Sequence, residues 1–285
     1  MTLVHLMQHA RRHPRKDQIR NAFSAALDYD GRAPVQRRAA ARLAERIGAL
    51  ALPEDARILE VGCGTGFVGQ ALGPHLPRAR WWATDISPEM VRRAQAALAK
   101  DPRFEFAVLD AEDPRPLAEA GPFDLICSSF AAQWFSDLEG VLAGLSRLLQ
   151  PHGRMLITTL ASGSFAEWRQ AHADLGLSPG GPTYPGADAL RRLTPGGLAC
   201  EVDVYEDAEA FTSGREFLAS LRSIGATTPR QDHVALGPAE IRRVLRRFEQ
   251  LGGVITYRIA TLDLRRSPPP APAAPPAGGR ASRRC

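Results

Sequence analysis

The sequence predicts an α/β protein with a mostly parallel β-sheet. Short runs of β-branched, aromatic and other apolar residues alternate with segments of helical periodicity, which is the pattern of βαβ units. A glycine-rich turn joins the first of these runs to the helical segment after it, as in folds that bind a nucleotide-like ligand at a strand end. The chain has 285 residues, of which 44% are hydrophobic and 24% charged, so it can bury a sizeable core.

Five strands are expected in the alternating region, because each candidate is a short apolar run bounded by polar or turn residues. They are Arg57–Val61, Arg80–Thr84, Phe104–Val108, Phe123–Cys127 and Arg154–Leu160. The helices expected between them are Phe67–Leu76, Pro88–Lys100 and Leu138–Leu149. Pro88 suits the first turn of a helix, and Ser87 suits the N-cap before it.

Further helices are expected on both sides of this region. Lys16–Leu27 and Val35–Leu50 precede the first strand. After Leu160 the pattern changes, and helical segments flank two more strand candidates. These helices are Ser164–Leu175, Gly214–Ile224 and Pro238–Leu251, and the strands are Ala199–Tyr205 and Gly253–Leu264.

Charge and composition exclude several classes of protein. The net charge of +5 comes from the two ends, because residues 21–264 hold 26 Lys and Arg against 30 Asp and Glu. We therefore expect no nucleic-acid partner, since that function needs a basic surface on the fold itself. No apolar stretch approaches the ~18 residues of a membrane span, and no secretory signal is recognisable, so we expect a cytoplasmic protein without a membrane partner. The cysteines, at positions 63, 127, 200 and 285, form no close pairs, which argues against a disulfide framework or a zinc knuckle. We expect no metal, and we expect a monomer.

The glycine-rich turn runs from Glu60 to Gly66 and is followed, 19 positions after Gly66, by Asp85 at the end of the next strand. An acid at that place can accept hydrogen bonds from both hydroxyls of a ribose. Gly64–Gly69 formally fits the dinucleotide pattern G-x-G-x-x-G, but this match begins two residues late. The carboxylate of Glu60 would repel a pyrophosphate and attract an amine, which favours S-adenosylmethionine over NAD.

At these residues the sequence resembles the class I S-adenosylmethionine-dependent methyltransferases. The first motif of that family corresponds to Glu60–Gly66, its ribose-binding acid to Asp85, and its acid on the adenine amino group to Asp110. Phe123–Ile126 resembles the fourth-strand motif, and Leu148–Arg154 resembles the turn before the fifth strand, with His152 in place of a glycine. The resemblance implies a Rossmann-like fold, with a mostly parallel seven-stranded sheet, helices on both faces and helical insertions that form a lid. It also implies that S-adenosyl-L-methionine is bound by Glu60, Gly62, Cys63, Gly64, Gly66, Asp85, Ile86, Met90, Asp110, Ala111 and Ser128.

A closer resemblance covers residues 17–264 and is to the malonyl-acyl-carrier-protein O-methyltransferases of biotin synthesis. It rests on Phe23–Asp30 with Ala33 and Gln36, on Ser128–Trp134, on Thr158–Leu160 with Gly163, Ser164 and Glu167, on Leu221–Thr227, and on Thr256–Tyr257. The sequence departs from the family in having two serines at 128 and 129, where Ser-Asn is frequent, and in its long tails. The resemblance implies methyl transfer to the free carboxylate of a malonyl thioester, on acyl-carrier protein or coenzyme A.

The resemblance implies one methyltransferase domain over residues 16–266, with a cofactor-binding core at 55–160 and substrate-side insertions at 164–252. Residues 1–15 are rich in Arg and His, and we expect a flexible N-terminus there, with a transit peptide as the alternative. Residues 267–285 are rich in Pro, Ala and Gly, and we expect them to be disordered.

The implied reaction needs little acid–base chemistry, because a malonyl carboxylate is already ionised at neutral pH. The protein must align the reacting atoms and exclude water. We expect Tyr29, Gln133 and Trp134 to do this around the methyl group and the carboxylate, although Tyr29 and Trp134 could instead be packing residues. Two other functions stay open: methylation of another small carboxylic acid, and an assembly or hydroxylation factor for a respiratory complex that shares the fold.

Four arginines, at 242, 243, 246 and 247, form a basic stripe on the expected helix Pro238–Leu251, opposite its apolar face. This pattern is typical of a solvated surface. It is also what the docking of an acidic carrier protein would use.

Overall fold

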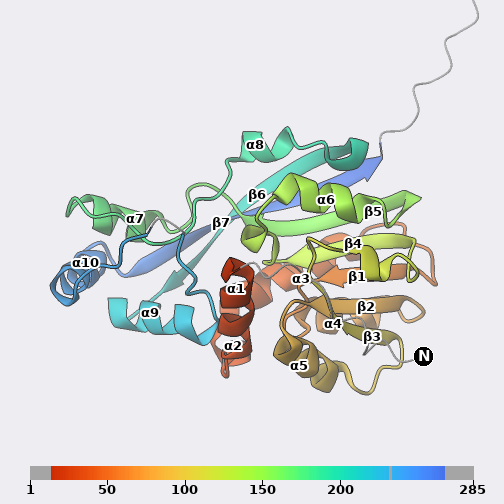
Figure 1. Cartoon of the computed structure of the whole chain (residues 1–285), viewed down its shortest axis with the longest axis horizontal. Coiled ribbons are helices and arrows are strands. Elements are labelled where there is room, and N and C mark those ends of the chain that lie inside the picture. The colour runs from red at the N-terminus through yellow and green to blue at the C-terminus, as the bar shows by residue number, and fades with distance from the viewer. Residues whose placement is uncertain (1–13, 231–232, 267–285) are drawn as a thin grey trace, which may run out of the picture.

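The computed structural model describes residues 14–230 and 233–266, and its centre is a seven-stranded sheet (Figure 1). The strand order is β3-β2-β1-β4-β5-β7-β6. Strands β1 to β5 are parallel, and β7 is antiparallel to its neighbours β5 and β6. The strands are β1 (Arg57–Val61), β2 (Arg80–Asp85), β3 (Phe104–Val108), β4 (Phe123–Ser129), β5 (Leu149–Leu160), β6 (Leu198–Ala210) and β7 (Val254–Arg266). The prediction of a mostly parallel sheet is confirmed.

Helices cover both faces of this sheet. On one face α3, α4 and α5 pack against Ile58, Trp81 and other side chains of the central strands. On the other face α6 and α8 pack against the residues that alternate with these, such as Leu59 and Trp82. Burial on both faces explains why the central strands β1, β2 and β4 are mostly apolar. The helices are α1 (Pro14–Ser24), α2 (Tyr29–Arg32), α3 (Pro34–Gly48), α4 (Phe67–Leu72), α5 (Pro88–Leu98), α6 (Leu138–Ser146), α7 (Ala166–Ala173), α8 (Ala187–Arg191), α9 (Gly214–Ser223) and α10 (Pro238–Gln250).

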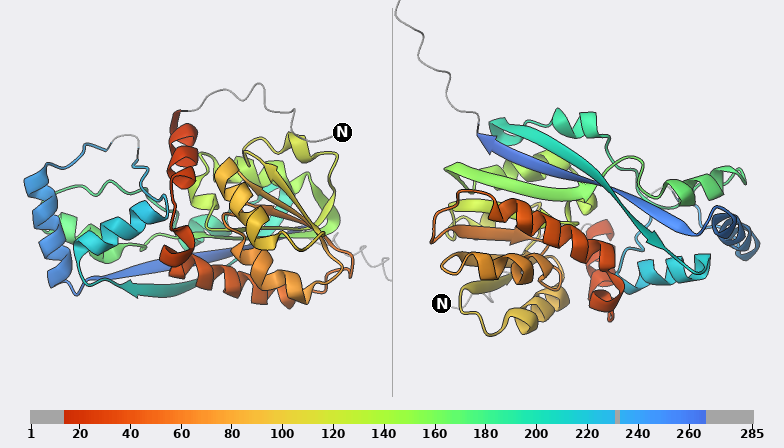
Figure 2. Two further views of the ribbon diagram at one scale, coloured as in Figure 1. Left: turned by 90° about the horizontal axis from the view of Figure 1, so that it is seen from below. Right: turned by 180° about the vertical axis from the view of Figure 1, so that it is seen from behind.

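The long strands β6 and β7 extend beyond the rest of the sheet and carry α7, α9 and α10 at their far end (Figure 1). This extension has an aromatic core of its own, centred on Phe217, Phe248 and Trp168. Glu167 of α7 ties the extension to β7, because its carboxylate accepts hydrogen bonds from the backbone N–H of Thr256 at 3.0 Å and from its hydroxyl at 2.6 Å. Helix α1 stands between the extension and the sheet, as both Figure 1 and the left view of Figure 2 show.

Some element boundaries differ from those expected. The helix expected to reach Leu149 ends at Ser146, because Leu149 pairs with Phe123 and begins β5. Helix α4 ends at Leu72, because Pro74 cannot continue the hydrogen-bonding pattern, and a short 3₁₀ turn follows. The sequence patterns did not reveal the short helices α2 and α8. The predictions for residues 1–13 and 267–285 lie outside the described residues.

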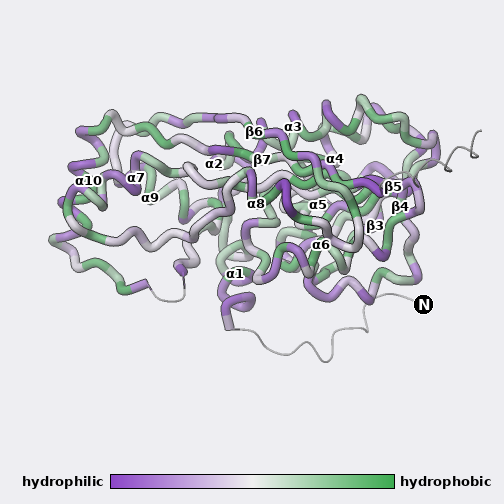
Figure 3. Tube along the Cα trace, turned by 90° about the horizontal axis from the view of Figure 1, so that it is seen from above, coloured by the Kyte–Doolittle hydropathy of each residue, from purple (hydrophilic) through white to green (hydrophobic). Residues whose placement is uncertain are grey.

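The distribution of apolar residues matches this architecture. Hydrophobic segments follow the sheet strands in Figure 3, whereas α10 alternates between hydrophilic and hydrophobic segments. Within the two described ranges, no helix combines the length and the apolar character that a membrane span requires.

Candidate functional site

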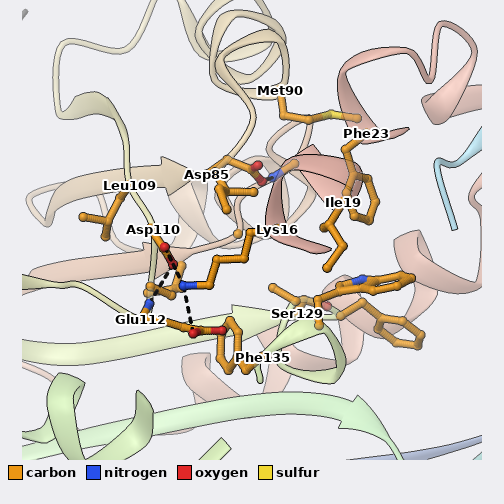
Figure 4. Close-up of a pocket in the computed structure, with 18 of the residues that line it drawn as sticks. Lys16, Ile19, Phe23, Asp85, Met90, Leu109, Asp110, Glu112, Ser129 and Phe135 are labelled. Carbon is orange, nitrogen blue, oxygen red and sulfur yellow. Dashed lines mark hydrogen bonds and ion pairs between the residues drawn. The ribbon is translucent and has the colours of Figure 1, made fainter. Parts of the chain in front are cut away.

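The ends of β1, β2 and β4 and the loop after β3 surround a cavity of about 730 Å³ that is partly open to solvent. We call it the first cavity. It lies where the strand order reverses between β1 and β4, the place at which open α/β sheets bind their ligands. Figure 4 shows side chains from the sheet, from α1 and from α5 pointing into it.

The glycine-rich turn forms one wall of the first cavity. Gly62, Gly64 and Gly66 have φ values of +69°, +55° and +92°, which side chains other than glycine rarely adopt. A Cβ on Gly62 would also collide with the Cβ of Ala131 in the loop after β4. The backbone is therefore exposed to any ligand that lies along the turn.

Asp85 ends β2 and faces the same turn. Its Oδ2 accepts a hydrogen bond from the N–H of Gly64 at 3.0 Å, and its Oδ1 accepts one from the N–H of Ser87 at 2.8 Å. Burial raises the pKa of Asp85 to about 6, although these backbone hydrogen bonds lower it. Each carboxylate oxygen can accept one more hydrogen bond, so Asp85 can bind two hydroxyl groups of a ligand.

Glu60 lies at the end of β1 with only 1% of its surface exposed. It lines a smaller cavity of about 300 Å³ next to the first, together with Tyr29, Gln36 and Thr65. Its Oε2 has no hydrogen-bond partner among the described residues. Burial, and then the nearby Asp85, raise the pKa of Glu60 to about 8. An unpartnered buried carboxyl group of this kind suits a ligand that brings a positive charge.

Helix α1 closes the first cavity on the side away from the sheet. Lys16 lies 2.7 Å from Oδ2 of Asp110 and 2.8 Å from Oε2 of Glu112, and these ion pairs are drawn in Figure 4. Burial lowers the pKa of Lys16, but the two carboxylates outweigh this effect and leave the pKa above its ordinary value. Ile19 and Phe23 of the same helix add apolar surface to the wall.

A second and larger cavity, of about 1680 Å³, lies under the extension. Phe130 and Trp134, in the loop after β4, line both cavities and form the wall between them. Phe130 has a φ of +58°, an uncommon conformation for a bulky residue. Its carbonyl accepts a hydrogen bond of 2.7 Å from Nε2 of Gln133, which holds this loop in place.

The structure brings most of the predicted site residues to these cavities. The first cavity is lined by Tyr29, Gly62, Gly64, Asp85, Ile86, Met90, Asp110, Ala111 and Trp134. Glu60 and Cys63 line the small cavity, and Gln133 lines the second cavity. Gly66 and Ser128 line none of the three: Gly66 precedes α4, and Ser128 is fully buried beside Ser129, which does face the first cavity.

Sequence reasoning missed the residues that α1 and the loop after β4 contribute. These are Lys16, Ile19 and Phe23 of α1, Phe130, Ala131 and Phe135 of the loop, Ser129 at the end of β4, and Glu112 after β3. The spacing of Lys16, Ile19 and Phe23 places them on one helix face, which could have been read from the sequence. The sequence did not show, however, which part of the molecule this face packs against. In the two described ranges, no group of three or more His, Cys, Asp or Glu side chains is placed to hold a metal ion.

Comparisons with known proteins agree with this geometry. A family model described as a methyltransferase domain matches residues 59–155. The chain is 47% identical over 244 residues to the biotin biosynthesis bifunctional protein BioCD of Bordetella avium, covering 85% of this chain and 51% of that protein. It therefore spans about half the length of this bifunctional relative. It is 41% identical over 248 residues to the malonyl-acyl-carrier-protein O-methyltransferase of Magnetococcus marinus, covering 86% of this chain and 91% of the relative.

Solved structures with low sequence identity share the fold. The YcgJ protein of Bacillus subtilis superimposes with a TM-score of 0.57 at 16% identity, covering 80% of this chain and 98% of that protein. This likeness concerns the arrangement of the sheet and its helices.

Proposed function

The chain belongs to the malonyl-acyl-carrier-protein O-methyltransferase family, and we propose that it methylates the free carboxylate of a malonyl group carried by acyl-carrier protein, in biotin synthesis. The observation that carries the proposal is the pair of cavities that meet at Phe130 and Trp134. The first cavity has the acidic groups that suit S-adenosyl-L-methionine. The second has the size and the apolar lining that suit a long acyl thioester.

Three carboxylates would hold three parts of the cofactor. Asp85 has a free acceptor site on each oxygen for the ribose hydroxyls. Glu60, buried and with its Oε2 lacking a partner in the described part of the chain, suits the ammonium group. Asp110, next to Lys16, suits the adenine amino group. The bound cofactor supplies an electrophilic methyl group on a sulfonium sulfur, and it carries no phosphate for Glu60 to repel.

Tyr29 in the first cavity, Gln133 in the second and Trp134 between them would position the acceptor rather than activate it. Burial, and then Asp85 and Asp30, raise the pKa of Tyr29, so its hydroxyl stays protonated and can donate a hydrogen bond to a carboxylate oxygen. Trp134 packs edge to face on Phe23, with ring centroids 5.6 Å apart, and this contact would help to exclude water from the junction. Gln133 donates a hydrogen bond to the carbonyl of Phe130, whose φ is +58°, and thereby holds the wall in place. Alignment of this kind can supply about 7–11 kcal/mol of the barrier reduction.

The size of the second cavity favours a thioester over a small free acid. Its lining extends from Trp134, at the junction, to Ile241 of α10. A free dicarboxylic acid would contact only a small part of this lining, whereas a malonyl group on a pantetheine arm would contact much more of it. We place the reaction in the cytoplasm and expect the protein to act as a monomer.

The test is an incubation of the full chain with methyl-labelled S-adenosylmethionine and malonyl-acyl-carrier protein. We expect label on the carrier protein as a base-labile methyl ester. Acetyl-acyl-carrier protein, which lacks the free carboxylate, is the control and should stay unlabelled. Label on free malonate but not on the carrier-bound malonyl group would show that the substrate is a small acid, and absence of label everywhere would contradict the methyltransferase assignment.

A further inference from the structure

The segment from Leu221 to Thr228 forms part of the wall of the second cavity. It comprises the last turn of α9 and the turn after it, and the side chains of Arg222, Thr227 and Thr228 are among those that line the cavity. Leu221–Thr227 is among the segments that resemble the malonyl-acyl-carrier-protein O-methyltransferases. Its position in the cavity wall links it to the acyl substrate.

The segment is held in place by α1. Gly225 has a φ of +72°, and a Cβ there would lie 2.9 Å from the backbone carbonyl of Ala22 and from the Cα of Phe23. Arg15 of α1 donates a hydrogen bond of 2.8 Å to the carbonyl of Pro229. Phe23 in turn packs on Trp134, so the segment has a defined position relative to the junction of the two cavities.

The charged side chains described in the lining of the second cavity are all basic. No described residue that lines it is acidic, whereas Arg169 and Arg222 both line it. The first cavity, by contrast, contains Asp85, Asp110 and Glu112. The second cavity therefore favours an anionic ligand.

Of the two arginines that the described structure places in this lining, Arg222 is the one whose side chain remains available. Arg169 already donates hydrogen bonds to the carbonyls of Ser164 and Pro182, at 3.3 and 2.6 Å. Across residues 14–230 and 233–266, the Arg222 side chain makes no hydrogen bond or ion pair, and neither do the hydroxyls of Thr227 and Thr228. A guanidinium and two hydroxyl groups on one cavity wall form a donor set for an oxyanion.

We propose that Arg222, with Thr227 and Thr228, binds an oxyanion of the acyl substrate in the second cavity. This inference rests on the proposed function and deepens it. The oxyanion has two possible sources in the substrate, the malonyl carboxylate and the phosphate of the pantetheine arm. The carboxylate and the phosphate each present two oxygen atoms that a guanidinium can bind through bidentate hydrogen bonds.

The test compares Arg222→Gln and Arg222→Lys with the control Arg215→Gln. Arg215 is an exposed arginine on the same helix that does not line the cavity. The ligands are malonyl-pantetheine, malonyl-phosphopantetheine and acetyl-phosphopantetheine. Binding is measured without cofactor by the quenching of tryptophan fluorescence, since Trp134 and Trp168 line the cavity, and KM and kcat are then measured for the malonyl compounds.

We expect Arg222→Gln to weaken binding about ten- to hundredfold for the ligands that carry the recognised anion, with KM raised and kcat nearly unchanged. Arg222→Lys should recover part of the affinity. If both malonyl ligands weaken alike while the acetyl ligand does not, the anion is the carboxylate. If both phosphorylated ligands weaken alike while malonyl-pantetheine does not, it is the phosphate.

Equal binding of all three ligands by Arg222→Gln and Arg215→Gln would overturn the proposal. So would a wild-type protein that binds none of them. A wild-type protein that binds the malonyl ligands through Arg222 without methylating them would leave this inference standing and contradict the proposed function.

Discussion

Two buried carboxyl groups, Glu60 on β1 and Asp85 at the end of β2, dominate the chemistry at the cofactor end of the site, and they differ in their hydrogen-bond partners. Asp85 receives two backbone hydrogen bonds, and burial raises its pKa to about 6. Glu60 has an oxygen without any partner among the described residues, and its pKa rises further, to about 8. Because of this difference in hydrogen bonding, Asp85 suits neutral donors such as ligand hydroxyl groups, whereas Glu60 suits a positively charged group of the ligand.

For Glu60 we expect opposite effects of Glu60→Gln on stability and on binding. The folded protein holds a proton on Glu60 up to about pH 8, whereas the unfolded chain releases it near the ordinary value, so the stability contributed by this site falls as pH rises between these two values. Removing the charge should raise the free energy of unfolding by about 1–3 kcal/mol at pH 8 and have little effect near pH 4. Thermal denaturation across this range measures the effect.

The same variant should bind S-adenosylhomocysteine at least tenfold more weakly, because the ammonium group of the ligand loses its carboxylate. Wild-type binding near pH 7 should release a proton from Glu60, which calorimetry in buffers of different ionisation enthalpy detects. Glu45→Gln, at an exposed position on α3, is the matched control. Buffer-independent heats and an unchanged affinity in Glu60→Gln would place the ammonium group elsewhere.

At the scale of elements, α1 lines the first cavity and contacts two segments that border the second. Its Lys16 bridges Asp110 and Glu112 over the first cavity, and its Phe23 touches the loop and the turn that border the second. The helix has only Ile19 fully buried, so its own packing is light. The ion pairs of Lys16 therefore matter for keeping it in place.

We expect Lys16→Gln to speed the dissociation of S-adenosylhomocysteine several-fold and to reduce the salt dependence of its affinity, because an ion pair that closes the cavity is lost. Stopped-flow displacement at two ionic strengths measures both. Arg20→Gln, which removes only the exposed pair with Asp17 on the same helix, serves as the control. A dissociation rate equal to that of the control would mean that α1 stays closed without Lys16.

The arginines of α10 are not equivalent. Val244, Leu245 and Phe248 are buried, and Arg242, Arg243 and Arg246 are exposed on the opposite face. Arg247, however, lies 2.6 Å from Asp174 and ties α10 to the end of α7. A test of carrier-protein docking must therefore leave Arg247 unchanged.

We expect Arg243→Glu combined with Arg246→Glu to raise KM for malonyl-acyl-carrier protein and to leave KM for malonyl-pantetheine nearly unchanged, because exposed charges mainly steer association. The effect should shrink at high salt, since such charges are screened over about 8–10 Å. Steady-state kinetics with the two substrates at two ionic strengths measures this. If the double variant treats both substrates alike, the arginines form an ordinary solvated surface.

On the scale of the whole molecule, the buried side chains form three separate clusters. Two lie on the faces of the sheet, and the third fills the extension that carries α7, α9 and α10. The cofactor residues depend on the first two clusters, whereas the second cavity depends on the third. A destabilising substitution in the extension should therefore impair the second cavity while leaving cofactor binding in the first cavity intact.

Phe217→Ala should test this separation. Phe217 is fully buried and contacts the rings of Trp168 and Phe248, so the change should cost about 3–5 kcal/mol in the free energy of unfolding of the extension. We expect binding of S-adenosylhomocysteine to persist while methyl transfer to the malonyl thioester is lost. Leu142→Ala, in the cluster under α6, is the control that lowers stability without altering the thioester KM. Equal loss of cofactor binding and methyl transfer in Phe217→Ala would show that the molecule responds as one unit.

The sequence alone determined the features that depend on neighbouring residues. The strands up to Leu160, the glycine turn at Glu60–Gly66 and the acid at Asp85 follow from periodicity, turn chemistry and short spacing, and the sheet confirms the predicted order of strands and helices. The boundary at Leu149 was wrong, because a helix and a buried strand share the same apolar residues, and only the pairing with Phe123 separates them.

Only the tertiary structure decided which distant residues meet. Lys16 reaches Asp110 across 94 positions of sequence, and Gly225 packs against Ala22 and Phe23 from the other end of the chain. That Glu60 Oε2 and the Arg222 side chain have no partner among residues 14–230 and 233–266 likewise depends on the neighbours that folding places around them. Local sequence patterns do not predict such neighbours. Burial and charge compensation arise only when segments that are distant in the sequence pack against one another.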